Sequence, residues 1–136
     1  MNTSSRRVIL ALTAVIGLYV GVWAEFLPRS FYASFPGLGR HWISLDGAYD
    51  EHLIRDVGSF YLALTAVSIA GIVARSAVVG RIAGLGWTVF GVLHFGYHVT
   101  HLDGSFADQA GNVITLGISA VLGVVLLFPA GASSRD

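Results

Sequence analysis

Three histidines near residue 100 have a spacing that could support chemistry. His94, His98 and His101 lie four and then three residues apart, which places them on one face of a helix. His52 and Asp56 lie four residues apart in an earlier segment, so they also share a helix face. Neutral imidazole and carboxylate are good ligands for Zn²⁺, Fe or Cu, and both groups serve as general acids and bases. This pattern therefore indicates a metal site or an acid–base pair.

Three uses of these residues stay open. A metal site would combine His52, Asp56, His94 and His98 with Glu25, near the end of the first apolar segment. A membrane enzyme would use His94, His98 and Asp56 as ligands or as an acid–base pair. In a purely structural role, His94 would pair with Asp56 and His98 with Glu25, because buried polar groups need hydrogen-bond partners. The absence of cysteine excludes a thiolate site.

Four apolar segments must position these side chains, over about 8–27, 52–74, 81–101 and 109–130. About 20 helical residues span the roughly 30 Å core of a bilayer. The first and fourth segments lack the polar stripe of a soluble helix, and all four are too long and continuous for barrel strands. We expect an all-α fold, an integral membrane four-helix antiparallel bundle with a long outer loop between helices 1 and 2. Residues 1–136 would form this single four-span domain.

The composition agrees with a membrane protein. Of 136 residues, 54% are hydrophobic and 12% are charged, against roughly 25% charged residues in soluble domains. The mean hydropathy is +0.71, which excludes a disordered chain. The formal charge is zero, and a nucleic-acid binder would need a basic surplus. The expected partner is therefore the lipid bilayer, with a membrane-complex partner or a second copy of the chain left open.

The charged residues divide unevenly between the two ends of such a bundle. One end would carry five arginines, namely Arg6, Arg7, Arg75, Arg81 and Arg135. The other end would carry the remaining three arginines together with seven of the eight acidic residues. Arginine accumulates on the cytoplasmic side, so we expect a multi-pass protein of the cell membrane with both termini cytoplasmic. Arg6-Arg7 also resembles an export signal, but the long apolar run and the bulky Trp23 favour an uncleaved first helix.

The expected outer loop is rich in aromatic residues, namely Phe31, Tyr32, Phe35, Trp42 and Tyr49. Aromatic rings favour the membrane–water interface, which predicts an interfacial half-helix over the bundle. A second interpretation makes this loop the wall of a pocket for a lipid or quinone.

Three residues are candidates for contact with a cofactor, namely Arg55, Trp42 and Tyr97. Arg55 could bind an anionic headgroup or carboxylate. The alternative is a helix-end ion pair with Glu51, four residues earlier.

Two stretches of the chain carry a family resemblance. They read RDVGSFYLAL over 55–64 and LHFGYHVTHLD over 93–103. With four spans and a long first loop, the chain resembles the small DoxX-like membrane proteins, including their uncharacterised actinobacterial relatives. The resemblance implies a four-helix membrane bundle and, as for some members, a link to quinone-dependent sulfur oxidation. Thiol chemistry does not transfer, because this chain has no cysteine, and no family catalytic residue can be mapped onto it.

Together these patterns predict an outward-facing pocket of His, Asp and Glu side chains. It would bind a metal, quinone or lipid in a redox-accessory protein. A membrane enzyme and a structural subunit of a membrane complex are the alternatives.

Overall fold

The computed structural model describes residues 3–129. Its helices are α1 (Ser4–Phe26), α2 (Pro28–Ser34), α3 (Trp42–Asp46), α4 (Glu51–Ala74), α5 (Ala77–Thr100) and α6 (Phe106–Leu127). No strand occurs between residues 3 and 129. The all-α prediction is thus confirmed, and α1, α4, α5 and α6 are each long and apolar enough to cross a membrane.

Three of the long helices start earlier than the apolar segments predict, two of them at a polar capping residue. Helices α1, α5 and α6 begin at residues 4, 77 and 106 rather than about 8, 81 and 109. The Thr3 hydroxyl accepts a hydrogen bond from the Arg6 N–H, and Ser105 and Asp108 form a reciprocal capping box. Helix α6 ends at Leu127, and the predicted end at residue 130 lies outside the described residues.

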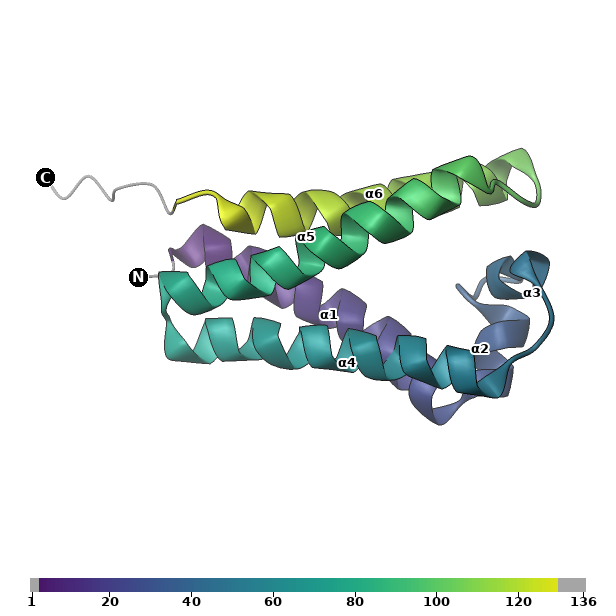
Figure 1. Cartoon of the computed structure of the whole chain (residues 1–136), viewed down its shortest axis with the longest axis horizontal. Coiled ribbons are helices and arrows are strands. Elements are labelled where there is room, and N and C mark those ends of the chain that lie inside the picture. The colour runs from purple at the N-terminus through teal and green to yellow at the C-terminus, as the bar shows by residue number, and fades with distance from the viewer. Residues whose placement is uncertain (1–2, 130–136) are drawn as a thin grey trace, which may run out of the picture.

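The long helices form two closely packed antiparallel pairs, α1 with α4 and α5 with α6 (Figure 1). Glycines allow the close approach within each pair. A Cβ atom on Gly58 of α4 would lie 2.5 Å from the backbone nitrogen of Glu25, and one on Gly84 would lie 2.5 Å from the Cβ of Leu126. Small residues of this kind let helix backbones pack closely in membranes.

The two pairs are joined in their interior by polar side chains. The Trp87 indole N–H of α5 donates to Ser68 Oγ of α4 at 2.9 Å, and the Thr13 hydroxyl of α1 lies 3.1 Å from the same oxygen. All three side chains are fully buried. The outward faces instead expose large apolar side chains, of which Val73, Leu93 and Phe106 are each more than 70% exposed. This arrangement is typical of helices surrounded by lipid.

The described chain begins and ends at the same end of the bundle. The buried Arg6 guanidinium donates to the carbonyl oxygens of Phe128 and Leu126, at 2.6 and 2.7 Å. These bonds connect the start of α1 to the end of α6. The short helices α2 and α3 lie at the opposite end (Figure 1). The segment between α1 and α4 carries two short helices, where the sequence predicted a long loop with one half-helix.

Candidate ligand cavity

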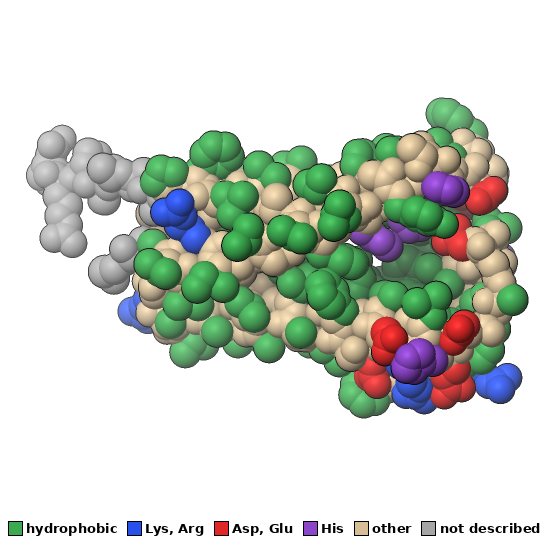
Figure 2. All heavy atoms as spheres, viewed as in Figure 1, with side chains coloured by type: hydrophobic (Ala, Val, Ile, Leu, Met, Phe, Trp, Pro, Cys, Tyr) green, Lys and Arg blue, Asp and Glu red, His purple; other side chains and the backbone are tan. Residues whose placement is uncertain are grey.

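A cavity of about 840 Å³ opens between the two helix pairs at the α2–α3 end. Its walls are mostly aliphatic and aromatic side chains, and all six helices contribute to them. Figure 2 shows the molecule hollowed at this end, with histidine side chains beside the hollow. The volume lies within the range of small-molecule binding sites.

One buried polar group beside this cavity, the imidazole of His98, has an atom without a hydrogen-bond partner among residues 3–129. The side chain is 8% exposed, and its Nδ1 atom has no hydrogen-bond partner in the described part of the chain. The His94 ring makes an edge contact with the His98 ring at a centroid distance of 4.7 Å and stacks on Phe90 at 4.9 Å. A buried polar atom without a partner is rare in folded proteins and is often satisfied by a bound molecule.

Helix α6 presents a polar face to the same cavity. Asn112, Thr115 and Ser119 all line it, three and then four residues apart. The fourth segment is expected from the sequence to lack the water-facing polar stripe of a soluble helix, and this short stripe faces the cavity instead. The stripe is short and its hydroxyls donate to α6 carbonyls, Thr115 to that of Gly111 and Ser119 to that of Thr115. The signal that could have found it was the spacing of polar residues, which an average over the apolar run conceals.

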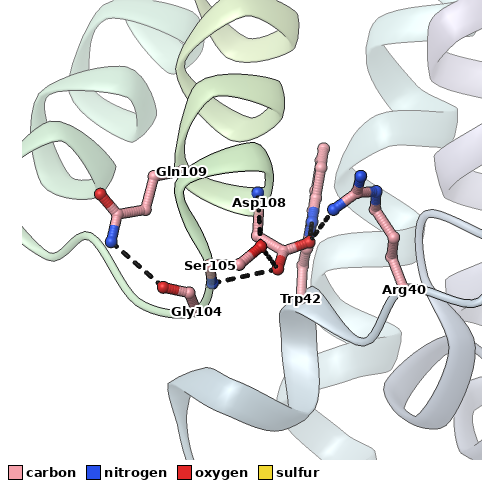
Figure 3. Close-up of polar contacts among 6 residues, drawn as sticks. All are labelled: Arg40, Trp42, Gly104, Ser105, Asp108 and Gln109. Carbon is pink, nitrogen blue, oxygen red and sulfur yellow. Dashed lines mark hydrogen bonds and ion pairs between the residues drawn. The ribbon is translucent and has the colours of Figure 1, made fainter.

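A cluster of polar contacts joins α3 and the residues before it to the start of α6 (Figure 3). The Trp42 indole N–H donates to Asp108 Oδ1 at 3.0 Å, and the Arg40 guanidinium pairs with the same oxygen. Ser105 donates to the other oxygen of the carboxylate through its backbone N–H at 3.1 Å and through its hydroxyl. We call the segment 28–46 the lid, and these contacts attach it to the α5–α6 pair.

The lid is attached to the α1–α4 pair by aromatic packing. Trp23 of α1 makes edge contacts with Phe31 and Phe35, at centroid distances of 6.0 and 5.9 Å. Phe35 in turn contacts Trp42 at 6.1 Å. Aromatic pairs in these geometries are each worth about 1 kcal/mol beyond simple burial. The lid therefore spans from one helix pair to the other.

Asp46, at the end of α3, brings an acidic group to the rim of the cavity. Its side chain is exposed on the outer surface but also lines the cavity. Partial desolvation raises the pKa of the Asp46 carboxyl above its ordinary value, and the nearby His98 opposes this to a smaller extent.

Four residues singled out from the sequence line the cavity, namely Trp42, His94, Tyr97 and His98. The other four lie outside it. Arg55 binds the carboxylate of Glu51 at 3.0 Å and lies 3.8 Å from that of Glu25, which agrees with the helix-end ion pair. His52 and Asp56 face each other at 3.3 Å on the surface of α4, with side chains 89% and 60% exposed.

The five residues expected to bind a metal are thus divided between three places. Glu25 is paired with Arg55, and Asp56 is paired with His52 rather than with a histidine of α5. Between residues 3 and 129, no group of three or more His, Asp and Glu side chains is arranged to hold a metal ion. The structural pairs His94–Asp56 and His98–Glu25 are not formed either, since Asp56 lies against His52 and the carboxylate of Glu25 lies beside Arg55.

Three comparisons with known proteins were negative. No protein-family model, curated protein or solved structure matches the chain. The resemblance to the DoxX-like proteins therefore stays a prediction.

Proposed function

We propose that this chain is a multi-pass membrane protein that binds a lipophilic molecule with a polar headgroup in the cavity beneath its lid. The single observation that carries this proposal is the unpartnered, buried Nδ1 of His98 beside an apolar cavity of about 840 Å³. Such a site has an apolar volume for the body of a ligand and an unpartnered polar atom to orient its head.

The membrane placement rests on the helices and their outer surfaces. Four helices have the length and composition of membrane spans, and their outward faces are largely apolar. Arg6, Arg7, Arg75 and Arg81 belong to the end with the termini and the α4–α5 turn. We therefore propose that this end is cytoplasmic in the cell membrane and that the lid faces outward. Arg135 and Asp136 belong to the same prediction but lie outside the described residues.

The ligand chemistry follows from the donors and acceptors in the cavity wall. His98 and His94 offer imidazole nitrogens, and Asn112 offers an amide. These groups suit a carbonyl or hydroxyl head, as in a quinone or an uncharged lipid. The scattered positions of the metal candidates favour such an organic ligand over a metal ion. A redox-accessory role and membership of the DoxX-like family are consistent with a quinone and belong to the same proposal.

The test uses the full chain in lipid nanodiscs with two probes, decylubiquinone and monooleoylglycerol. We expect saturable binding of one probe, and which probe binds distinguishes a quinone from a lipid. His98→Phe keeps a ring in the wall but removes the nitrogens, so it should weaken binding about tenfold, the worth of one hydrogen bond. His52→Phe is the matched control, because its side chain lies on the outer surface.

Two results would contradict the proposal. One is the absence of saturable binding of either probe together with no organic molecule copurifying with the protein, which would favour a structural subunit. The other is an equal effect of His98→Phe and His52→Phe on binding in folded samples.

A further inference from the structure

A second hollow lies on the outer face of α4 and α5. Its lining residues are Phe60 of α4 and Gly86, Val89, Phe90, Leu93, His94 and Tyr97 of α5. The hollow is a surface groove of about 480 Å³ and is largely apolar. Val89 and Leu93 are 53% and 71% exposed, so this groove would face lipid in a membrane. We call it the α4–α5 groove.

Two side chains belong both to this groove and to the cavity. His94 and Tyr97 line each of them, so these two α5 side chains form part of the wall between the cavity and the groove. His94 is half-buried and Tyr97 is exposed. Tyr97 stacks on His101 at a centroid distance of 4.2 Å and meets the edge of His98 at 5.5 Å. No hydrogen bond of the His94 ring or of the Tyr97 hydroxyl links α5 to α4 in the described residues.

Helices α4 and α5 diverge toward the lid. Helices α4 and α5 are joined by the two-residue turn 75–76, and their other ends lie apart in Figure 1. Phe90 packs on Phe60 at 4.9 Å and on Tyr61 at 5.0 Å, which closes the α4–α5 contact below the level of His94. On the lid side of Phe90, the groove therefore lies next to the cavity, and His94 and Tyr97 line both of them.

From this shared wall we propose that the α4–α5 groove binds the hydrocarbon tail of the ligand whose head lies at His98. The ligand would be an uncharged amphiphile with a single chain too long for the cavity. Its chain passes between α4 and α5 beside His94 and Tyr97 and continues along Val89 and Leu93 into the bilayer. The ligand reaches its site laterally from the membrane while the lid stays closed. This inference rests on the proposed function.

The first experiment fills the groove without changing the cavity. Val89→Trp places an indole in the groove, and Val92→Trp is the control, because Val92 lies on the same helix, is equally exposed and does not line the groove. For decylubiquinone or monooleoylglycerol in nanodiscs, Val89→Trp should weaken binding about tenfold, since the tail loses its exit. A tail-less counterpart, the same quinone with a methyl group or glyceryl monoacetate, should bind both variants equally.

The second experiment locates the chain by photo-crosslinking. A probe with a diazirine at the end of its chain should label residues of the α4–α5 groove, and His98→Phe should reduce this labelling. Labelling of the lid, or equal labelling of the lipid-facing surfaces of all four long helices, would overturn the inference. Equal binding of the long-chain probe by the Val89→Trp and Val92→Trp proteins would also overturn it.

The two proposals can fail separately. If the tail-less probe binds and His98→Phe weakens it, the cavity is a binding site whatever the tail does. If neither the long-chain nor the tail-less probe depends on His98, the proposed function itself is wrong.

Discussion

The indole N–H of Trp42 and the Oδ1 atom of Asp108 lie 3.0 Å apart, although 66 residues separate them in the chain. Trp42 belongs to the lid and also lines the cavity, while Asp108 caps the start of α6. A Cβ atom on Gly111 would lie 2.8 Å from the Trp42 ring, so this indole also packs closely against α6. One side chain therefore contributes both to the cavity wall and to the attachment of its lid.

Removing the indole N–H should loosen the lid. Trp42→Phe keeps an aromatic ring in the wall but removes the donor to Asp108, which we expect to cost about 1 kcal/mol. If the ligand leaves through the lid, dissociation measured by stopped-flow fluorescence should become severalfold faster. If it leaves along the α4–α5 groove, as proposed above, the dissociation rate should stay unchanged while the thermal unfolding midpoint falls.

Trp23→Phe is the matched change at the other attachment of the lid, on the α1–α4 pair. It removes an indole hydrogen bond of 3.1 Å to Ser30, away from the α6 attachment. A loss of stability confined to Trp23→Phe would show that the contact between Trp42 and Asp108 does not hold the lid.

The buried Arg6 should be important for stability. Its guanidinium donates to two carbonyl oxygens at the end of α6, where a positive charge also interacts favourably with the helix dipole. Arg6→Met should destabilise the fold by about 2 kcal/mol, because those carbonyls lose charged donors. Arg7→Met is the matched control, since Arg7 is exposed. Equal unfolding midpoints for the two variants in detergent would contradict this role of Arg6.

Gly58 should tolerate no side chain. A Cβ atom there would lie 2.5 Å from the backbone nitrogen of Glu25, and backbone cannot move aside as a flexible side chain can. Gly58→Ala should therefore separate α1 from α4 and cost about 2 kcal/mol. Gly96→Ala is the control in α5, because its Cβ would meet nothing within 4 Å. Thermal unfolding of both should show a loss for Gly58→Ala and no loss for Gly96→Ala, whose helix propensity improves.

The raised pKa of Asp46 predicts that this residue lowers the stability of the protein as the pH rises. Its carboxyl pKa is raised in the folded protein, so the folded state binds the proton more tightly than the unfolded state does. Its ionisation therefore costs stability as the pH rises from the unfolded pKa, about 3.9, through the folded pKa. Asp46→Asn should raise the unfolding midpoint more at pH 7 than at pH 4. His98, His101 and Asp103 face the same carboxyl and are present in both proteins, so the comparison removes their own titration.

The opposite pH trend would be informative. If Asp46→Asn lowered the midpoint at pH 7 relative to pH 4, the carboxylate would be stabilised in the folded state by its neighbours. In that case the attraction between His98 and the Asp46 carboxylate would exceed the cost of partly desolvating that carboxylate.

Part of the candidate site could be predicted from helical spacing. His94 and His98 lie four residues apart, and their rings do meet beside the cavity. His52 and Asp56 have the same spacing and also meet, but on the outer surface of α4. Spacing within one helix predicts which side chains are neighbours, but it does not predict which way that face turns.

The remaining residues of the site depend on distances between helices. Glycines such as Gly58 and Gly84 hold α1 against α4 and α5 against α6, which leaves room for a cavity between the two pairs. This arrangement places Asn112 and His98 on the same cavity wall. It leaves Glu25 outside the cavity, beside Arg55.

The sequence by itself determined that the chain folds into four long apolar helices with an aromatic segment after the first. Length, hydropathy and capping residues are local properties, and local properties decide where a helix can form. Only the tertiary structure decided that His98 borders a cavity while His52 and Asp56 face outward. The rotation of each helix about its axis depends on close contacts such as that of Gly58 with Glu25, between residues far apart in the chain.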